Sequence, residues 1–267
     1  MPDTHALQPG QPVALGDIPT TAEVFAKDRA AARDEFRTLR RELIEWQRRL
    51  YAEGKQKLLI VLQAMDAGGK DGTIRNILKG VNPQGVRVES FKVPSKRELA
   101  HDFLWRVHRV VPGKGMITVF NRSHYEDVLV VRVEDIVPEA VWRPRFQAIN
   151  DFERLLTESG THILKFYLHI SPGEQRERFK ARLEVPEKHW KFSHADLDKA
   201  KDWDAYMVAY AEALEQCTTA AAPWHVVPAD QKWYRNLAVM RTVVDRLRRM
   251  DPQYPPPEHD IKNVVIS

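Results

Sequence analysis

The chain has 267 residues and a formal net charge of +4, a mild excess of positive charge that allows a polyanionic ligand without requiring one. Its single cysteine, Cys217, excludes an intramolecular disulfide and a cysteine-based zinc site, and a cytoplasmic location fits. The first residues lack a signal-peptide pattern, and no apolar run is long enough to span a bilayer. These features predict one domain of ordinary globular composition.

The first predicted element is a long amphipathic helix, or two helices with a break. Apolar residues recur at helical spacing from Thr21 to Gly54, and Gly54 is well placed to end the helix. Residues 1–20 contain proline and glycine and are expected to wrap the surface. Together these segments predict an N-terminal helical extension over about residues 1–54.

Strands and helices alternate along the rest of the chain. Strands are predicted over residues 57–65, 86–93, 115–120, 161–170 and 224–229. Helices are predicted from Asp71, over 95–111, in two stretches over 126–159, from Ser171 and over 232–250. This order predicts an α/β fold, a three-layer α/β/α sandwich whose parallel sheet binds ligands at the carboxyl ends of its strands.

The segment between Arg182 and Ala195 interrupts this alternation. It joins the basic helix from Ser171 to a second helical sequence and is expected to lie beyond the strand ends. A closing lid occupies that position in P-loop kinases. A lid module over about residues 178–205 is therefore expected within the single domain 1–267, and a simple surface loop is the alternative.

Gly68, Gly69 and Lys70 stand between a predicted strand and a predicted helix, the context of a phosphate-binding loop. Glycines let the backbone approach an anion, and the loop N–H groups and the helix start add positive potential. A glycine-rich turn with a surface lysine is the alternative. The loop residues expected to bind phosphate or nucleotide are Ala67, Gly68, Gly69, Asp71, Gly72, Thr73, Arg75 and Asn76.

The loop departs twice from the usual G-x-x-x-x-G-K-[ST] pattern, because Ala64 replaces the first glycine and Asp71 the hydroxyl residue. Asp66 also adds a carboxylate to an anion site. A carboxylate fits beside phosphate when a cation stands between them, so Asp66 is expected to bind Mg²⁺ or to orient the phosphoryl acceptor. Asp71 is interpreted only as an acid at a helix start, and the Thr73 hydroxyl is expected to point elsewhere.

The sequence NRSHYED at residues 121–127 follows the third predicted strand. Asn121 stands where a Walker-B aspartate is usual and, like Glu126, is expected to bind phosphate or nucleotide. Arg122 is well placed to grip a phosphoryl group, and a structural ion pair is the alternative. Glu126 and Asp127 could serve Mg²⁺ or the acceptor, with helix capping as the alternative.

Two further groups of basic residues are candidates for phosphate binding. Arg178 and Arg182 lie four residues apart, on one face of a helix near the lid base, where they could reach a transferring phosphoryl group. A basic stretch over residues 92–114 suits a long polyanion. In both cases a solvated basic face is the alternative. The residues expected to line a polyanion groove are Lys79, Lys92, Lys96 and Arg97.

Four blocks in the chain, AMDAGGKDGTIRNIL, FNRSHYEDVLVVRV, RERFKARLEVPEKHWKFS and DWDAYMVAYAEAL, together resemble the polyphosphate kinase 2 family. The resemblance covers about residues 20–250 and implies a P-loop kinase core, similar to thymidylate kinase, with a helical lid. It implies transfer of the terminal phosphoryl group of inorganic polyphosphate to adenine or guanine nucleotides, with Mg²⁺ or possibly Mn²⁺. It further implies a homo-oligomer, dimer or tetramer, and no nucleic-acid or membrane partner is expected.

The same resemblance assigns roles to individual residues. The catalytic residues that it implies are Asp66, Lys70, Arg122, Arg178 and Arg182. Many members carry aspartate at the position of Asn121, so Asp127 is predicted to join Asp66 as the second metal ligand. The sequence NRSHYED, with Glu126 in place of asparagine, resembles that of the branch of the family that phosphorylates both AMP and ADP. The alternatives are a kinase restricted to ADP and GDP or to AMP, an ATP-dependent nucleotide kinase of the same fold, and a P-loop-like nucleic-acid-binding protein.

Overall fold

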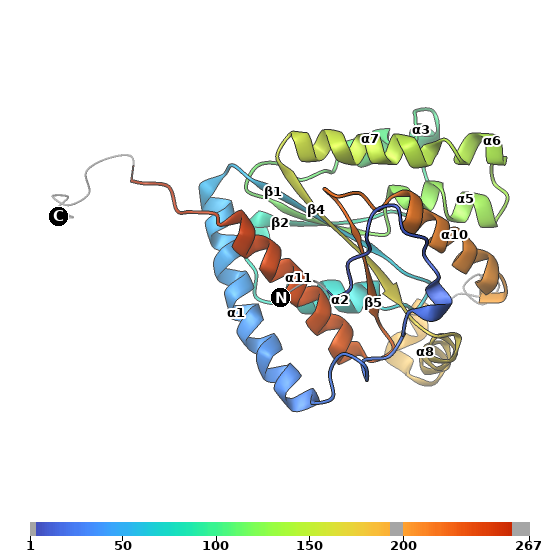
Figure 1. The fold of residues 1–267 in the computed structure, drawn as a ribbon, viewed down its shortest axis with the longest axis horizontal. Helices are drawn as coiled ribbons and strands as arrows, with labels where there is room; N and C mark the ends of the chain where they lie inside the picture. Colours follow the sequence, from blue (N-terminus) through green and yellow to red (C-terminus); the bar gives the residue numbers. More distant parts are fainter. Residues whose placement is uncertain (1–3, 193–199, 258–267) are drawn as a thin grey trace.

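A computed structural model describes residues 4–192 and 200–257, and its centre is a parallel sheet of five strands in the order β2-β3-β1-β4-β5 (Figure 1). The strands are β1 (Lys57–Gln63), β2 (Val86–Ser90), β3 (Ile117–Asn121), β4 (Thr161–His169) and β5 (Trp224–Pro228). Leu58 to Leu62 of β1 are fully buried, as expected for a strand covered on both faces. Because β1 pairs with both β3 and β4, the loop that follows it lies at the middle of the sheet.

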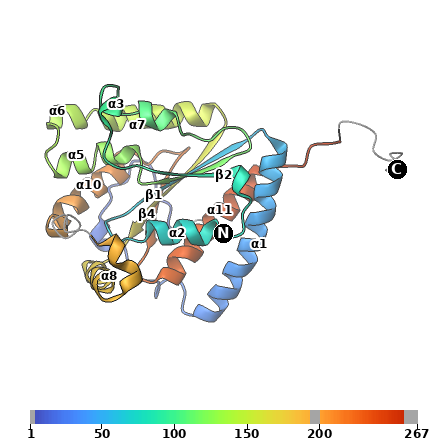
Figure 2. The ribbon, with the colours of Figure 1, turned by 180° about the vertical axis from the view of Figure 1, so that it is seen from behind.

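Helices cover both faces of this sheet, which confirms the predicted three-layer α/β/α fold. The α-helices are α1 (Arg29–Glu53), α2 (Lys70–Ile77), α3 (Lys96–Leu99), α4 (Trp105–His108), α5 (Val130–Val133), α6 (Glu139–Trp142), α7 (Arg145–Glu158), α8 (Pro172–Glu184), α10 (Trp203–Gln216) and α11 (Lys232–Met250). The 3₁₀ helices are η1 (Leu15–Asp17), η2 (Pro83–Gly85), η3 (His124–Asp127) and η4 (Pro186–Lys191). Figures 1 and 2 show α1, α2 and α11 on one side of the sheet and α5, α7 and α10 on the other.

The N-terminal helix begins later than predicted. The carboxylate of Asp28 accepts hydrogen bonds from the amides of Ala30 and Ala31, and this cap starts α1 at Arg29. Gly54 ends the helix in the left-handed conformation, as predicted. Residues 4–28 run mostly as irregular chain along the sheet, where Ala6 bridges to β5.

The predicted helix over residues 95–111 is wrong, because the structure has two short helices there. Ser95 and Glu98 form the predicted capping box that starts α3. The carboxylate of Asp102 then accepts a hydrogen bond from the amide of Leu104 at 2.9 Å, which turns the chain. This turn lets Val107 of α4 reach the core, where it is fully buried.

The two helical stretches predicted over residues 126–159 are η3, α5, α6 and α7 in the structure, since Pro138 and Pro144 begin two of them. The predicted lid includes the end of α8 and η4. It also includes residues 193–199, and these seven residues lie outside the described part of the chain. Within the described residues, no helix is both long and apolar enough to cross a bilayer.

Candidate active site

The phosphate loop joins the end of β1 to the start of α2 and is compact. Ala67 and Gly69 both have positive φ, 61° and 101°. A Cβ on Gly68 would lie 2.4 Å from the Cβ of Ala64, so glycine is required at residue 68 because the Ala64 methyl group fills that space. Ala64 itself has no positive φ. The first departure from the usual loop pattern is therefore accommodated within the loop.

Lys70 is the first residue of α2, and its ammonium group points back toward the end of β1. Nζ donates a hydrogen bond to the carbonyl oxygen of Ala64 at 2.8 Å. Burial, together with the positive charge of Arg122, lowers the pKa of Lys70 from 10.5 to about 8. A buried lysine that holds its charge weakly is poised to take an anion as its partner.

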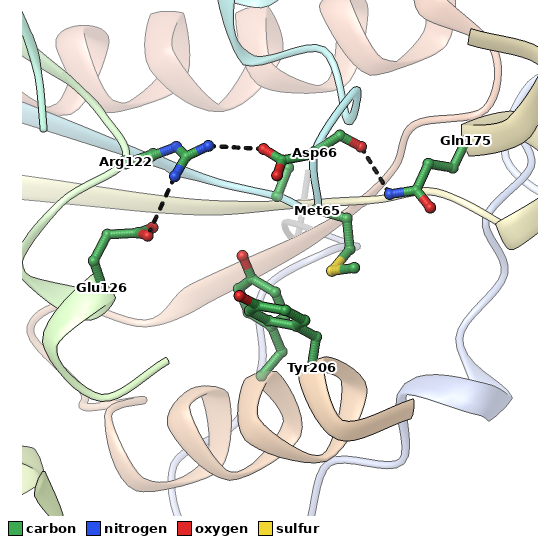
Figure 3. Close-up of a pocket in the computed structure, with 8 residues that line it drawn as sticks. Met65, Asp66, Arg122, Glu126, Gln175 and Tyr206 are labelled. Atoms are coloured by element: carbon green, nitrogen blue, oxygen red, sulfur yellow. Dashed lines mark hydrogen bonds and ion pairs between the residues drawn. The ribbon is translucent and has the colours of Figure 1, made fainter. Parts of the chain in front are cut away.

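Arg122 lies between two carboxylates at the carboxyl end of β3 (Figure 3). Its Nη2 is 2.7 Å from Oδ1 of Asp66, and its Nη1 is 3.6 Å from Oε2 of Glu126. Arg122 has a φ of 62°, a left-handed conformation that is unusual for this residue type. The backbone thus turns the guanidinium toward the phosphate loop, where it forms ion pairs, and its predicted contact with a phosphoryl group stays a prediction.

A small pocket adjoins this ion-pair group. Met65, Gln175, Tyr206 and Tyr210 contribute to its lining, together with the Asp66–Arg122–Glu126 group. The side-chain amide of Gln175 donates to the carbonyl oxygen of Asp66 at 3.0 Å and so fixes the loop backbone (Figure 3). Tyrosine rings thus lie beside a carboxylate and an arginine, but the free volume of the pocket is only about 20 Å³, which is too small for a whole nucleotide.

A much larger cavity, of about 870 Å³, lies over the phosphate loop. It is enclosed by the loop, the ends of β2 and β3, helix α8, η4 and the start of α11. The predicted residues that line it are Asp66, Ala67, Gly68, Gly69, Lys70, Asp71, Gly72, Arg75, Lys92, Asn121, Arg122, Arg178 and Arg182. Residues predicted separately on four parts of the chain thus surround one cavity.

Several predicted residues lie elsewhere. The Thr73 hydroxyl donates to the carbonyl oxygen of Gly69 at 3.2 Å, and the Asn76 amide donates to that of Gly72 at 2.8 Å, so both side chains bond within α2. Thr73 is fully buried, in agreement with the expectation that its hydroxyl points away. Of the predicted groove residues, Lys79, Lys96 and Arg97 are exposed and lie outside the described lining of the large cavity.

Asp127 does not face Asp66 as its predicted role as a second metal ligand requires. Its carboxylate lies 3.5 Å from Nη2 of Arg106 and 3.4 Å from Nη1 of Arg145. Burial raises its pKa despite both arginines. The reason is the 3₁₀ turn of η3, which directs Glu126 toward Arg122 and Asp127 toward α4 and α7. Sequence spacing alone could not distinguish these two adjacent acids.

Asp71 has partners that the sequence did not indicate. The Asn121 side-chain amide donates to Oδ1 at 2.9 Å, and Nζ of Lys191 lies 3.1 Å from Oδ2. Partial burial opposes ionisation, but these two contacts prevail and lower the pKa of Asp71. Asp71 therefore ties the phosphate loop to β3 and to η4, and Asn121 is its hydrogen-bond donor.

Arg178 and Arg182 both lie on the face of α8 that lines the large cavity. Arg178 donates to the loop carbonyl of Ala67 at 2.9 Å and pairs with Glu174 at 2.7 Å. Arg182 donates to the carbonyl oxygen of Lys191 at 3.2 Å. Their guanidinium groups hold α8 and η4 around the cavity.

Sequence reasoning missed four basic residues in this lining. They are Lys188 and Lys191 on η4 and Lys232 and Arg235 on α11. Arg235 lies among buried positions such as Ala238 and Val239. An arginine at a core position of an amphipathic helix was the available signal.

A parallel sheet with a phosphate loop after its central strand and cations around that loop defines a P-loop-type kinase, as predicted. The family model for polyphosphate kinase 2 (PPK2) matches residues 26–255. The chain therefore belongs to the polyphosphate kinase 2 family, which confirms the resemblance.

Individual relatives cover nearly all of the chain. It is 52% identical over 249 residues to an AMP/ADP-polyphosphate phosphotransferase of Meiothermus ruber, with 93% of each chain covered. It is 43% identical to an ADP-polyphosphate phosphotransferase of Rhodopseudomonas palustris, covering 92% of this chain and 89% of the other. The crystal structure of polyphosphate kinase 2 from Arthrobacter aurescens TC1 superposes with a TM-score of 0.93 at 40% identity, covering 97% of this chain and 93% of that one.

Proposed function

We propose that this protein transfers the terminal phosphoryl group of inorganic polyphosphate to AMP and ADP. The observation that carries the proposal is the charge of the large cavity, whose described lining holds ten lysine and arginine residues against three carboxylates. Such an excess suits a chain of phosphates better than a single nucleotide. The name of the Meiothermus ruber relative supports both acceptors.

The large cavity would hold the donor, and the acceptor would approach Asp66 from the side of the small pocket. Asp66 lies in the lining of both, so it is placed to orient the acceptor phosphate oxygen that attacks the donor. That oxygen forms the new bond to the terminal phosphorus as the anhydride bond to the shortened chain breaks. Lys70, Arg122, Arg178 and Arg182 are placed to stabilise the negative charge on the donor and the transferred group.

Phosphotransferases of this family generally require a divalent metal. Asp66 and Glu126 fit such a metal, because both carboxylates are partly exposed and both lie beside Arg122. Within residues 4–192 and 200–257, no group of three metal-binding side chains is present. Two carboxylates suffice for Mg²⁺, which takes its remaining ligands from phosphate oxygens and water. We assign Mg²⁺, with Mn²⁺ as its substitute, to these residues, where it would neutralise charge between acceptor and donor.

One assay tests the proposal. The protein is incubated with polyphosphate and Mg²⁺, once with AMP and once with ADP, and the nucleotides are separated by chromatography. Formation of ADP and ATP, respectively, is expected. No product from either acceptor would refute the function, and product from ADP alone would restrict it. Lys70→Ala should lose turnover, while the exposed Lys180→Ala should keep it.

Other expectations stay predictions with their own tests. Use of guanine nucleotides is tested by replacing AMP and ADP with the corresponding guanine nucleotides in the same assay. A homo-oligomer is tested by light scattering after size-exclusion chromatography. The cytoplasmic location needs fractionation of cells. Salt-sensitive binding to DNA without phosphoryl transfer would favour the nucleic-acid alternative.

A further inference from the structure

Arg235 on α11 is a buried cation with little to neutralise it. Arg235 is only 3% exposed. Its Nε and Nη2 donate hydrogen bonds to Oδ1 of the adjacent Asn236 at 3.2 and 2.9 Å. Among the described residues, no carboxylate lies within ion-pair distance of it. Burial and the charge of Arg178 lower its pKa to about 9. A buried, unpaired charge is unfavourable, so a ligand that supplies the opposite charge would bind strongly there.

The guanidinium of Arg235 points at the phosphate loop. A Cβ on Gly69 would lie 1.9 Å from Nη1 of Arg235, and a Cβ on Gly72 would lie 3.3 Å from Nη2. Figure 2 shows α2 between α8 and α11, so this approach closes the loop from the α11 side. The missing side chains of Gly69 and Gly72 therefore leave room for the guanidinium of Arg235. An anion bound to the loop would lie beside this guanidinium.

The neighbours of Arg235 are also cations. Lys232 lies one turn earlier on α11, and Arg178 of α8 and Lys188 of η4 line the same cavity. Burial and the charges of Arg178, Lys188 and Arg235 lower the pKa of Lys232. Glu174 is an acid near both side chains, and it already pairs with Arg178 at 2.7 Å.

We propose that Arg235 and Lys232 form a donor subsite that binds the phosphoryl oxyanions of the polyphosphate chain as it leaves the phosphate loop. The planar guanidinium suits two oxygens of one phosphoryl group, and the ammonium suits the next. The donor chain then passes between α8, η4 and α11, away from the surface that carries Lys96 and Arg97. The identity of the ligand rests on the proposed function, whereas the subsite itself fits any linear phosphoanhydride.

The test compares Arg235→Gln and Arg235→Lys with Arg241→Gln, a control that removes the same charge from an exposed position of α11. Arg235→Gln should raise the KM for polyphosphate about 10- to 100-fold, with the KM for AMP changed less than about twofold. Arg235→Lys should recover part of the loss, and Arg241→Gln should match the wild type. Lys232→Gln should raise the KM for polyphosphate by a smaller factor.

Calorimetric titration with tripolyphosphate in the absence of nucleotide tests the donor subsite independently of the proposed phosphotransferase activity. Arg235→Gln should weaken binding by a similar factor while the melting temperature of the ligand-free protein stays equal or rises, because a buried charge is removed. Weakened binding in a protein without transferase activity would support the subsite and refute the function. Unchanged binding, or equal losses for AMP and polyphosphate with a lowered melting temperature, would overturn the subsite and make Arg235 structural.

Discussion

The buried ammonium of Lys70 gives the stability of this protein a specific dependence on pH. Folding lowers the pKa of Lys70 from 10.5 to about 8, mainly by burial. Below pH 8 the group is charged in both states, and the folded state bears the full cost of that charge. Between pH 8 and 10.5 the unfolded chain binds more protons than the folded protein, so the free energy of unfolding rises with pH.

The size of this effect follows from the two pKa values. A fall from 10.5 to about 8 corresponds to about 3 kcal/mol at about 1.4 kcal/mol for each pH unit. Lys70→Met keeps the apolar stem and removes the charge. It also leaves the Ala64 carbonyl oxygen without its donor, which costs about 1–3 kcal/mol at every pH. Only the first of these two terms depends on pH.

Urea denaturation of the wild type and Lys70→Met between pH 7 and pH 10.5 measures that term. Stability of the variant relative to the wild type should fall by about 3 kcal/mol across this range. Subtracting the two proteins cancels the titration of other groups. Lys180→Met, at an exposed lysine, should give a constant difference. A constant difference for Lys70→Met as well would refute the argument that burial depresses its pKa.

Activity should change in the opposite direction with pH. Only the protonated Lys70 offers a charge to the donor, so kcat/KM for polyphosphate should fall as pH rises above about 8. Bound polyphosphate stabilises the ammonium, so kcat at saturation should start to fall at a higher pH. A kcat/KM value that stays level up to pH 9.5 would contradict this role.

Two other contacts give testable expectations. Asp71→Asn should leave the melting temperature nearly unchanged, since the half-exposed pair with Lys191 is worth at most about 1 kcal/mol. Hydrogen exchange of the η4 amides should become up to about fivefold faster. Unchanged exchange would show that the pair does not hold η4. Lys165→Met should destabilise the protein by about 3–5 kcal/mol in urea denaturation, because the buried carboxylate of Glu153 loses the ammonium group 2.6 Å away and keeps its contacts with His124 and the Tyr125 hydroxyl. A loss below about 1 kcal/mol would mean that Glu153 is neutral in the folded protein.

The sheet and the phosphate loop could be predicted because their signals are local. The apolar run of β1 is buried over Leu58–Leu62, and the glycines follow it directly. The helix boundaries were less predictable, since they depend on single side chains. Asp28 caps α1, so the helix begins eight residues after Thr21, where it was predicted to begin. Asp102 ends a helical pattern that otherwise continues.

In the candidate site, too, some features have local causes in the sequence and others depend on residues far apart in the chain. Gly68 accommodates Ala64 within one turn of the chain, so the first departure in the loop has a local cause. Asp71 is different, because its partner Asn121 is 50 residues away and its partner Lys191 is 120 residues away. No pattern in a single sequence joins such positions. Only the packing of β3 and η4 against the loop reveals them.

Arg235 extends this reasoning to the chemistry. The phosphate loop approaches α11 closely because Gly69 and Gly72 lack side chains, and that approach buries a guanidinium that has no carboxylate partner among residues 4–192 and 200–257. Lys70 is buried on the same loop. Both cations carry lowered pKa values, and a phosphate chain would restore both toward their usual range. The folded protein would thus bear a cost in stability that the donor relieves, so bound polyphosphate should raise the free energy of unfolding.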